Sequence, residues 1–145
     1  MGVKMRVLIC GSRDFKDYEK ICYFMSGVIA QGYQPTVVIS GTASGADTLG
    51  EKWAAENKVA VERYPANWTK YHKAAGPIRN QQMLDAKPDL IFGFPTRPED
   101  IGNGTKDMLS RGCKVGIPTF YASGEEWIRV TVPLKRTIRT HSWYL

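Results

Sequence analysis

The chain has 145 residues, a formal net charge of +6, a hydrophobic fraction of 43% and a charged fraction of 23%. This length fits one compact domain, the composition is that of a folded globular protein, and no apolar run reaches the roughly 20 residues of a membrane-spanning helix. The N-terminus lacks the apolar region and cleavage site of a signal peptide. We therefore expect a cytoplasmic protein with no membrane partner.

Three widely spaced cysteines, Cys10, Cys22 and Cys113, lie in apolar contexts and show no metal-like clustering. They are expected to be buried free thiols rather than redox centres. No other group of side chains has metal-ligand spacing, so neither a metal nor a cofactor is expected.

The first half of the chain alternates between strand and helix patterns. Residues 3–10 predict a strand, and residues 18–32 predict a helix whose apolar side chains recur at helical spacing before a C-capping glycine. The β-branched run at 36–40 is typical of a strand covered on both faces, and a helix is expected at 45–57.

The second half continues this alternation. Its expected elements are a strand at 59–65, a helix with Pro77 in its first turn, a strand at 89–95, a helix at 104–112 and a strand at 114–120. Such alternation requires crossover connections and favours an α/β fold, with a mainly parallel five-stranded sheet between two helical layers. Residues 1–120 would form this domain, and 121–145 a C-terminal extension that is an edge strand or a subunit-contact tail.

In such a sheet, ligands bind beyond the carboxyl ends of the strands, where the strand order reverses. The turn after the first strand offers Gly11 for a tight bend, the Ser12 hydroxyl, and an Arg13 guanidinium suited to phosphate. The alternative is an ordinary turn in which Asp14 or Asp17 caps the next helix.

The turn after the second strand, SGTASGAD, is rich in small residues. Gly41, Gly45 and the small residues Thr42, Ala43 and Ser44 would leave backbone N–H groups exposed at a helix N-terminus, which is a ready site for an anion, and Ala46 is a candidate ligand-binding residue of the same turn. Asp47 would accept a hydrogen bond from a ribose hydroxyl, or would only be a favourable charge on the helix dipole.

A second glycine-rich turn, Gly102, Asn103, Gly104 and Thr105, stands directly before the helix at 104–112. It has no bulky side chain that would keep an anion away from the helix N-terminus. The alternative is a flexible connector.

The stretch GPIRNQQM places Arg79 and Asn80 near the start of a helix, close to the expected mouth of the sheet. Its guanidinium and amides make directional hydrogen bonds, which favours a ligand-facing patch over a solvated helix face. Trp68, Tyr71 and His72 come just before it. Each could stack on a base, although a core tryptophan and a surface histidine are commoner.

Five motifs, GSRDF, GTASGADTLGEKWA, YPANW, AAGPIRNQQMLD and GNGTKDMLSRG, occur in this order. Together they resemble the SLOG superfamily, and specifically its YspA-like branch, whose members are often found in bacteriophage and bacterial genomes. The resemblance covers roughly residues 4–120. It implies a three-layer α/β/α Rossmann-like domain, a nucleotide or nucleotide-derived small-molecule ligand, and a homodimer or higher homo-oligomer.

The superfamily includes the LONELY GUY phosphoribohydrolases, which cleave the N-glycosidic bond of nucleoside 5′-monophosphates. Their R-K-x-x-M element supplies a catalytic arginine, and P-G-G-x-G-T-x-x-E supplies a phosphate-binding turn and a catalytic glutamate. Arg79 matches the arginine and 102–105 match the turn, but Met108 stands at the glutamate position. Asp107 comes one residue early, about 100° round the helix. The candidate replacements for the carboxylate are Asp14, Asp47 and Asp107.

Two functions remain open at this point. In the first, the chain binds a nucleotide or nucleotide-derived ligand at the carboxyl ends of the strands, as a sensor or sequestering module that could also hydrolyse it. In the alternative, it is a phosphoribohydrolase with Arg79, Asp107 and Asp47 as catalytic residues. Nucleic acid is not expected as a partner, because the sequence has no continuous basic stripe interleaved with aromatic residues.

Overall fold

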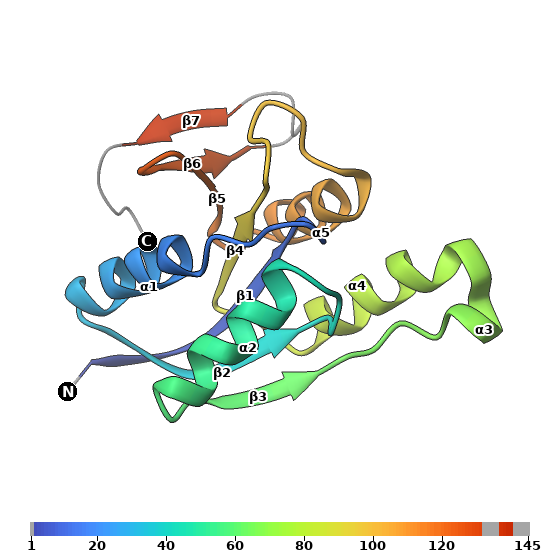
Figure 1. Cartoon of the computed structure of the whole chain (residues 1–145), viewed down its shortest axis with the longest axis horizontal. Helices are drawn as coiled ribbons and strands as arrows, with labels where there is room; N and C mark the ends of the chain where they lie inside the picture. The colour runs from blue at the N-terminus through green and yellow to red at the C-terminus, as the bar shows by residue number, and fades with distance from the viewer. Residues whose placement is uncertain (1, 132–136, 141–145) are drawn as a thin grey trace.

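A computed structural model of the chain describes residues 2–131 and 137–140. Its seven-stranded sheet has the order β3-β2-β1-β4-β5-β6-β7 (Figure 1). The strands are β1 (Val3–Gly11), β2 (Tyr33–Ser40), β3 (Ala60–Arg63), β4 (Leu90–Phe94), β5 (Thr119–Ser123), β6 (Glu126–Val130) and β7 (Thr137–Thr140). The helices are α1 (Tyr18–Ala30), α2 (Ala46–Glu56), α3 (Trp68–Tyr71), the short 3-10 helix η1 (His72–Ala74), α4 (Ala75–Asp85) and α5 (Asn103–Lys114).

The sheet confirms the predicted α/β class. Strands β3, β2, β1, β4 and β5 are parallel, and β6 and β7 add an antiparallel edge, so the sheet has seven strands rather than five. β1 pairs with β2 on one side and β4 on the other, so the strand order reverses between β1 and β4. This reversal is where ligands bind in open α/β sheets.

The fifth strand lies later in the chain than predicted. Helix α5 continues to Lys114, and the strand runs from Thr119 to Ser123, whereas the prediction had it begin at Lys114 and end at Phe120. Gly116, with a φ of +84°, makes the turn between them, because a left-handed backbone favours glycine. The predicted C-terminal extension therefore contains the end of β5 together with β6 and β7, and its residues 132–136 and 141–145 lie outside the described part of the chain.

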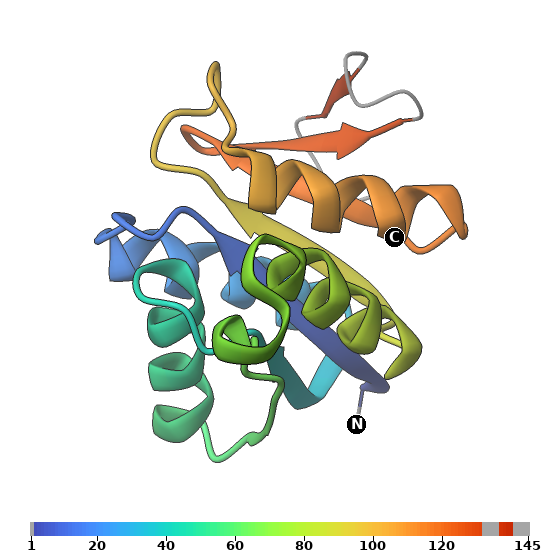
Figure 2. The same ribbon diagram turned by 90° about the vertical axis from the view of Figure 1, so that its right-hand side faces the viewer.

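Each face of the sheet carries its own hydrophobic core. Helices α1 and α2 cover one face, where the fully buried Phe24 and Phe92 pack with Trp127. Helices α4 and α5 lie side by side over the other face (Figure 2), where Met83 and Met108 are buried. The described residues contain no helix long and apolar enough to cross a membrane.

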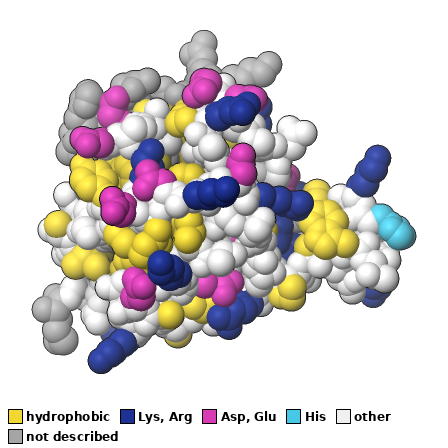
Figure 3. All heavy atoms as spheres, viewed as in Figure 1, with side chains coloured by type: hydrophobic (Ala, Val, Ile, Leu, Met, Phe, Trp, Pro, Cys, Tyr) yellow, Lys and Arg dark blue, Asp and Glu magenta, His cyan; other side chains and the backbone are white. Residues whose placement is uncertain are grey.

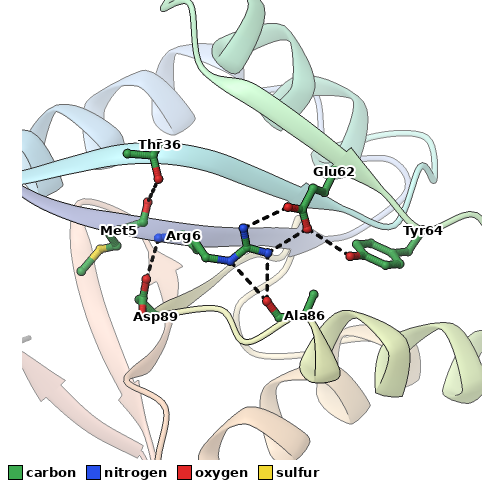
Figure 4. Close-up of polar contacts among 7 residues, drawn as sticks. All are labelled: Met5, Arg6, Thr36, Glu62, Tyr64, Ala86 and Asp89. Atoms are coloured by element: carbon green, nitrogen blue, oxygen red, sulfur yellow. Dashed lines mark hydrogen bonds and ion pairs between the residues drawn. The ribbon is translucent and has the colours of Figure 1, made fainter.

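A polar network ties β1, β3 and the C-terminal end of α4 together (Figure 4). The Arg6 guanidinium donates to both Glu62 carboxylate oxygens, at 2.9 and 2.8 Å, and also to the carbonyl of Ala86, which ends α4. The Tyr64 hydroxyl donates to Glu62 at 3.0 Å, and Asp89 accepts from the Arg6 backbone N–H at 2.8 Å. The network fixes where α4 ends relative to the sheet.

Replacing Glu62 with glutamine is expected to lower the free energy of unfolding by less than about 1 kcal/mol at pH 7, because the ion pair is partly exposed. The hydrogen bonds from Arg6 hold the pKa of Glu62 below its usual range. The stabilisation is therefore present above the ordinary glutamate pKa and is lost as the pH falls through the lowered value. Urea denaturation at pH 7 and pH 3 measures this, with the exposed Glu99→Gln as control. Equal destabilisation at both pH values would contradict the role given to the pair.

Candidate functional site

A cavity of about 490 Å³ opens at the carboxyl ends of β1 and β4, where the strand order reverses. Its lining comes from the end of β1, from the turns after β1, β2 and β4, and from helices α2, α4 and α5. The lining residues are Cys10, Gly11, Ser12, Arg13, Asp14, Ala43, Asp47, Arg79, Asn80, Met83, Thr96, Arg97, Asp100, Gly102, Gly104, Thr105 and Met108.

Most of the residues singled out from the sequence as ligand-binding meet in this cavity. Those that line it are Gly11, Ser12, Arg13, Asp47, Arg79, Asn80, Gly102, Gly104 and Thr105. Those that do not are Gly41, Gly45, Ala46 and Asn103. Gly41 instead lines a neighbouring, smaller cavity.

The turns after β1 and β4 are joined by hydrogen bonds. Gly11 packs against β4 so closely that a Cβ there would lie 2.3 Å from the Phe94 carbonyl oxygen, which excludes any other residue. The Ser12 hydroxyl accepts from the Thr96 N–H at 2.9 Å, and the Thr96 hydroxyl donates to Asp14 at 2.8 Å. These bonds hold the floor of the cavity in place.

The turn after β2 differs from its prediction. The Ala46 N–H donates to the Ser12 carbonyl at 3.1 Å, and the Ala43 N–H donates to the Asp47 carboxylate at 3.1 Å. These two N–H groups are therefore not available to an anion, contrary to expectation. Gly45 has a φ of +75°, and a Cβ there would lie 2.2 Å from the Ser12 carbonyl oxygen. The backbone conformation and this close packing therefore require glycine at this position.

The turn before α5 leaves open space beside the start of the helix. Gly102 is the N-cap of α5 and makes no side-chain capping bond, and the first N–H groups of a helix have no partner within it. A Cβ at Gly102 or Gly104 would meet no atom within 4 Å, and neither residue has a positive φ. Neither packing nor backbone conformation therefore requires glycine here, and the space beside the helix N-terminus is left free.

Arg79 and Asn80 connect α4 to the turns on either side of the cavity. The Arg79 guanidinium donates to the Gly41 carbonyl and, at 3.0 Å, to the Asn80 side-chain oxygen. The Asn80 amide is buried and donates to Asp107 at 2.9 Å, and Arg111 donates to the same Asp107 oxygen at 2.8 Å. The hydrogen bonds to Gly41 and Asn80 thus fix the orientation of the Arg79 guanidinium.

Two of the candidate carboxylates, Asp47 and Asp107, differ in whether they line the cavity. Asp107 does not line the cavity, since its carboxylate faces Asn80 and Arg111, and Met108 lines the cavity instead. Asp47 does line it and is only 6% exposed. Burial raises the pKa of Asp47 to about 6, although the Ala43 N–H and Arg79 act in the opposite direction. Asp47 is therefore the deeply buried carboxylate of the cavity, and Asp107 positions Asn80.

The sequence analysis assigned no ligand-binding role to several lining residues, namely Cys10, Met83, Thr96, Arg97 and Asp100. Thr96 and Arg97 lie just beyond Pro95, which follows the last residue of β4, so the rule that ligands bind beyond the carboxyl ends of the strands points to them as well. Cys10 is a buried free thiol, as predicted, and burial raises its pKa. Cys22 and Cys113 are free but only partly buried.

The sequence of the chain is similar to one protein-family model and to a phage protein. The model of the YspA, cpYpsA-related SLOG family matches residues 5–71, which include the turns after β1 and β2 and end before Arg79. The chain is 32% identical over 122 residues to the Gene 61 protein of Mycobacterium phage D29, covering 79% of this chain and 94% of that protein.

Among solved structures, the chain is similar to glycinamide ribonucleotide transformylase 1 from Symbiobacterium toebii. The sequence identity is 17% and the TM-score is 0.42, over 83% of this chain. The chain spans half the length of that transformylase chain, 50%.

Proposed function

The chain belongs to the YspA, cpYpsA-related SLOG family, and from this premise we propose that its main cavity binds a nucleotide or nucleotide-derived small molecule. The family and the Rossmann-like fold are consistent with nucleotide-related binding. The proposal adds where the ligand sits and which groups hold it.

The open turn before α5 is the observation that carries the proposal. Backbone N–H groups at a helix N-terminus favour an anion, and Gly102 and Gly104 leave the space in which one would fit. Arg13, Arg79 and Arg97 line the same cavity. Guanidinium groups bind phosphate in a bidentate manner, so the cavity combines two independent means of holding a phosphorylated ligand.

In this proposal the ligand is held intact, as in a sensor or a sequestering module. A homo-oligomer, a cytoplasmic location and the absence of a nucleic-acid partner stay predictions from the sequence.

Asp47 favours a second candidate, hydrolysis by a phosphoribohydrolase. In that reaction water adds across the N-glycosidic bond: the hydroxyl goes to C1′ of the ribose, and the departing base takes up the proton. The transition state resembles an oxocarbenium ion, which an ionised carboxylate stabilises. Asp47 would supply that carboxylate above pH 6, with Arg79 and the turn before α5 holding the 5′-phosphate.

Mass spectrometry of the protein incubated with nucleoside monophosphates and ADP-ribose tests both candidates. Analysing the solution and the protein separately distinguishes them. An intact compound retained by the protein, with no turnover, is the expected result for a binding module. Release of free base and ribose 5-phosphate would favour the hydrolase, and neither retention nor turnover of any compound would contradict both.

Replacing Gly104 with valine is expected to weaken the retained ligand's affinity more than 10-fold while the fold is preserved. The added side chain meets no protein atom at its Cβ, but it fills the space beside the helix N-terminus. Valine is also better tolerated than glycine within a helix. Isothermal titration calorimetry and thermal denaturation measure the two effects, with Ser110→Val, on the same helix but outside the cavity, as control. Unchanged affinity in the Gly104 variant would place the phosphate elsewhere.

A further inference from the structure

A second cavity, of about 330 Å³, adjoins the main one. It lies between the turn after β2 and the connection from β3 to α3, and it shares Arg13, Ala43 and Arg79 with the main cavity. A ligand that extends from one cavity into the other would therefore lie close to both Arg13 and Arg79. The proposed function makes no use of this second space.

Trp68 distinguishes the second cavity. Of the tryptophans in the described part of the chain, Trp53 and Trp127 are 3% and 5% exposed, whereas Trp68 is 48% exposed. Large aromatic side chains are mostly buried, so an exposed aromatic ring beside a cavity indicates a surface that a ligand could contact. The Arg13 guanidinium carbon lies 5.5 Å from the centre of the Trp68 ring, within the range of a cation–π contact.

Hydrogen bonds hold the backbone segments that line the second cavity. Trp68 begins the short helix α3, which is capped by Asn67 through a 3.0 Å bond from the Lys70 N–H. Thr42, which lines the same cavity, has a φ of +65°, which is strained for a residue other than glycine, and its N–H donates to the Ser40 hydroxyl at 3.1 Å. Non-glycine residues with such strain concentrate at functional sites.

We infer that this second cavity is the aromatic-ring subsite of the ligand, in which a nucleobase stacks on Trp68. The inference rests on the proposed function and adds to it the orientation of the ligand. The phosphate lies in the main cavity, the base lies against Trp68, and Arg13 and Arg79 stand between them. Pro65 and Ala66 supply a low apolar wall that would accept a flat ring. Stacking is tolerant of base identity, because every base has a π-face.

The surface around the subsite fits this use. Figure 3 shows hydrophobic side chains beside Lys or Arg side chains on the projection that α3 and the start of α4 form in Figure 1. An apolar surface bordered by positive charge suits a compound with a flat ring at one end and an anionic group at the other.

Calorimetric titration of wild type and Trp68→Ala with AMP, GMP, CMP, UMP and ribose 5-phosphate tests the inference. Trp68→Ala is expected to weaken the nucleoside monophosphates by about 10-fold or more, which is the usual contribution of one base–aromatic stack. Ribose 5-phosphate, which has no base, is expected to bind both proteins alike. Tyr71→Ala, which removes a neighbouring exposed ring outside both cavities, is the matched control. It is expected to change neither the affinity for the nucleoside monophosphates nor that for ribose 5-phosphate.

The outcomes separate the inference from the proposed function. Nucleotides that bind wild type and Trp68→Ala equally, or an equal loss for nucleotides and ribose 5-phosphate, would overturn the ring subsite and leave nucleotide binding in place. If wild type binds none of the five compounds, the ring subsite is overturned; if it also retains no ADP-ribose in the mass-spectrometric test, the proposed function is lost as well. Should Trp68→Ala unfold, Trp68→Phe serves instead, since it keeps a stacking ring. It is expected to retain most of the affinity and to lose the tryptophan quenching that nucleotides, but not ribose 5-phosphate, produce in wild type.

Discussion

Replacing Arg79 with methionine is expected to weaken the binding of nucleoside monophosphates about 100-fold or more. Arg79 is half-buried and lines both cavities, and its guanidinium is oriented by Gly41 and Asn80. Truncating one partner of a buried, hydrogen-bonded charge pair typically costs about 2–5 kcal/mol of binding energy, and each 1.4 kcal/mol is a factor of ten. Methionine keeps much of the length and the apolar part of the side chain, so the change removes the charge and the hydrogen bonds of the guanidinium while most of the packing is kept.

The measurement is calorimetric titration of the wild type and of two variants, Arg79→Met and Arg79→Lys. Lysine keeps the charge but not the planar fork, so an intermediate affinity is expected. Thermal denaturation shows whether the variants remain folded. Wild-type affinity in a folded Arg79→Met protein would remove Arg79 from the proposed site.

Asp47→Asn is the second change with a large expected effect, and here the protein should become more stable. Burial raises the pKa of Asp47 from 3.8 to about 6, so the folded protein binds this proton more tightly than the unfolded chain does. Between these pH values the free energy of unfolding falls as the pH rises, because the unfolded state binds fewer protons. Above pH 6 the ionised carboxylate costs stability, up to about 3 kcal/mol from the size of the shift.

Asparagine keeps the acceptor for the Ala43 N–H but cannot ionise. The variant should therefore be more stable than wild type at pH 8 and should lose this advantage below pH 4. Urea denaturation across pH 3.5–8 measures it, with Asp85→Asn, an exposed aspartate at the end of α4, as control. A variant less stable than wild type at pH 8 would mean that the Asp47 carboxylate is better satisfied than its burial suggests.

The same variant separates the two candidate functions. Ionised Asp47 adds negative charge to a cavity proposed to receive a phosphate, so Asp47→Asn should retain binding or improve it above pH 6. If the chain is instead a phosphoribohydrolase, the variant should lose turnover while it still binds. A buried carboxylate that lowers the free energy of unfolding is typical of a functional site, and Asp47 has this property.

Much of the fold could be predicted from the sequence, because short β-branched runs and helical apolar spacing are local patterns. The first, second and fourth strands lie close to where their runs predicted them, and the parallel order follows from their alternation with helices. The fifth strand was misplaced because the apolar Val115, Ile117 and Pro118 belong to the turn at Gly116 and the connection between α5 and β5. Periodicity alone does not distinguish such a turn from a short strand.

The sequence by itself also determined which residue types stand after the strands: the glycines of both turns, Arg13, and the Arg79–Asn80 pair. Only the tertiary structure decided which of them meet and which are already occupied. The N–H groups of Ala43 and Ala46 bond within the protein, whereas the turn before α5 is open, although both turns read alike as sequence. Likewise, Asp107 and Met108 are adjacent in the chain but face different surroundings. The physical reason is that hydrogen-bond partners, burial and pKa depend on groups distant in sequence, which only the folded sheet brings together.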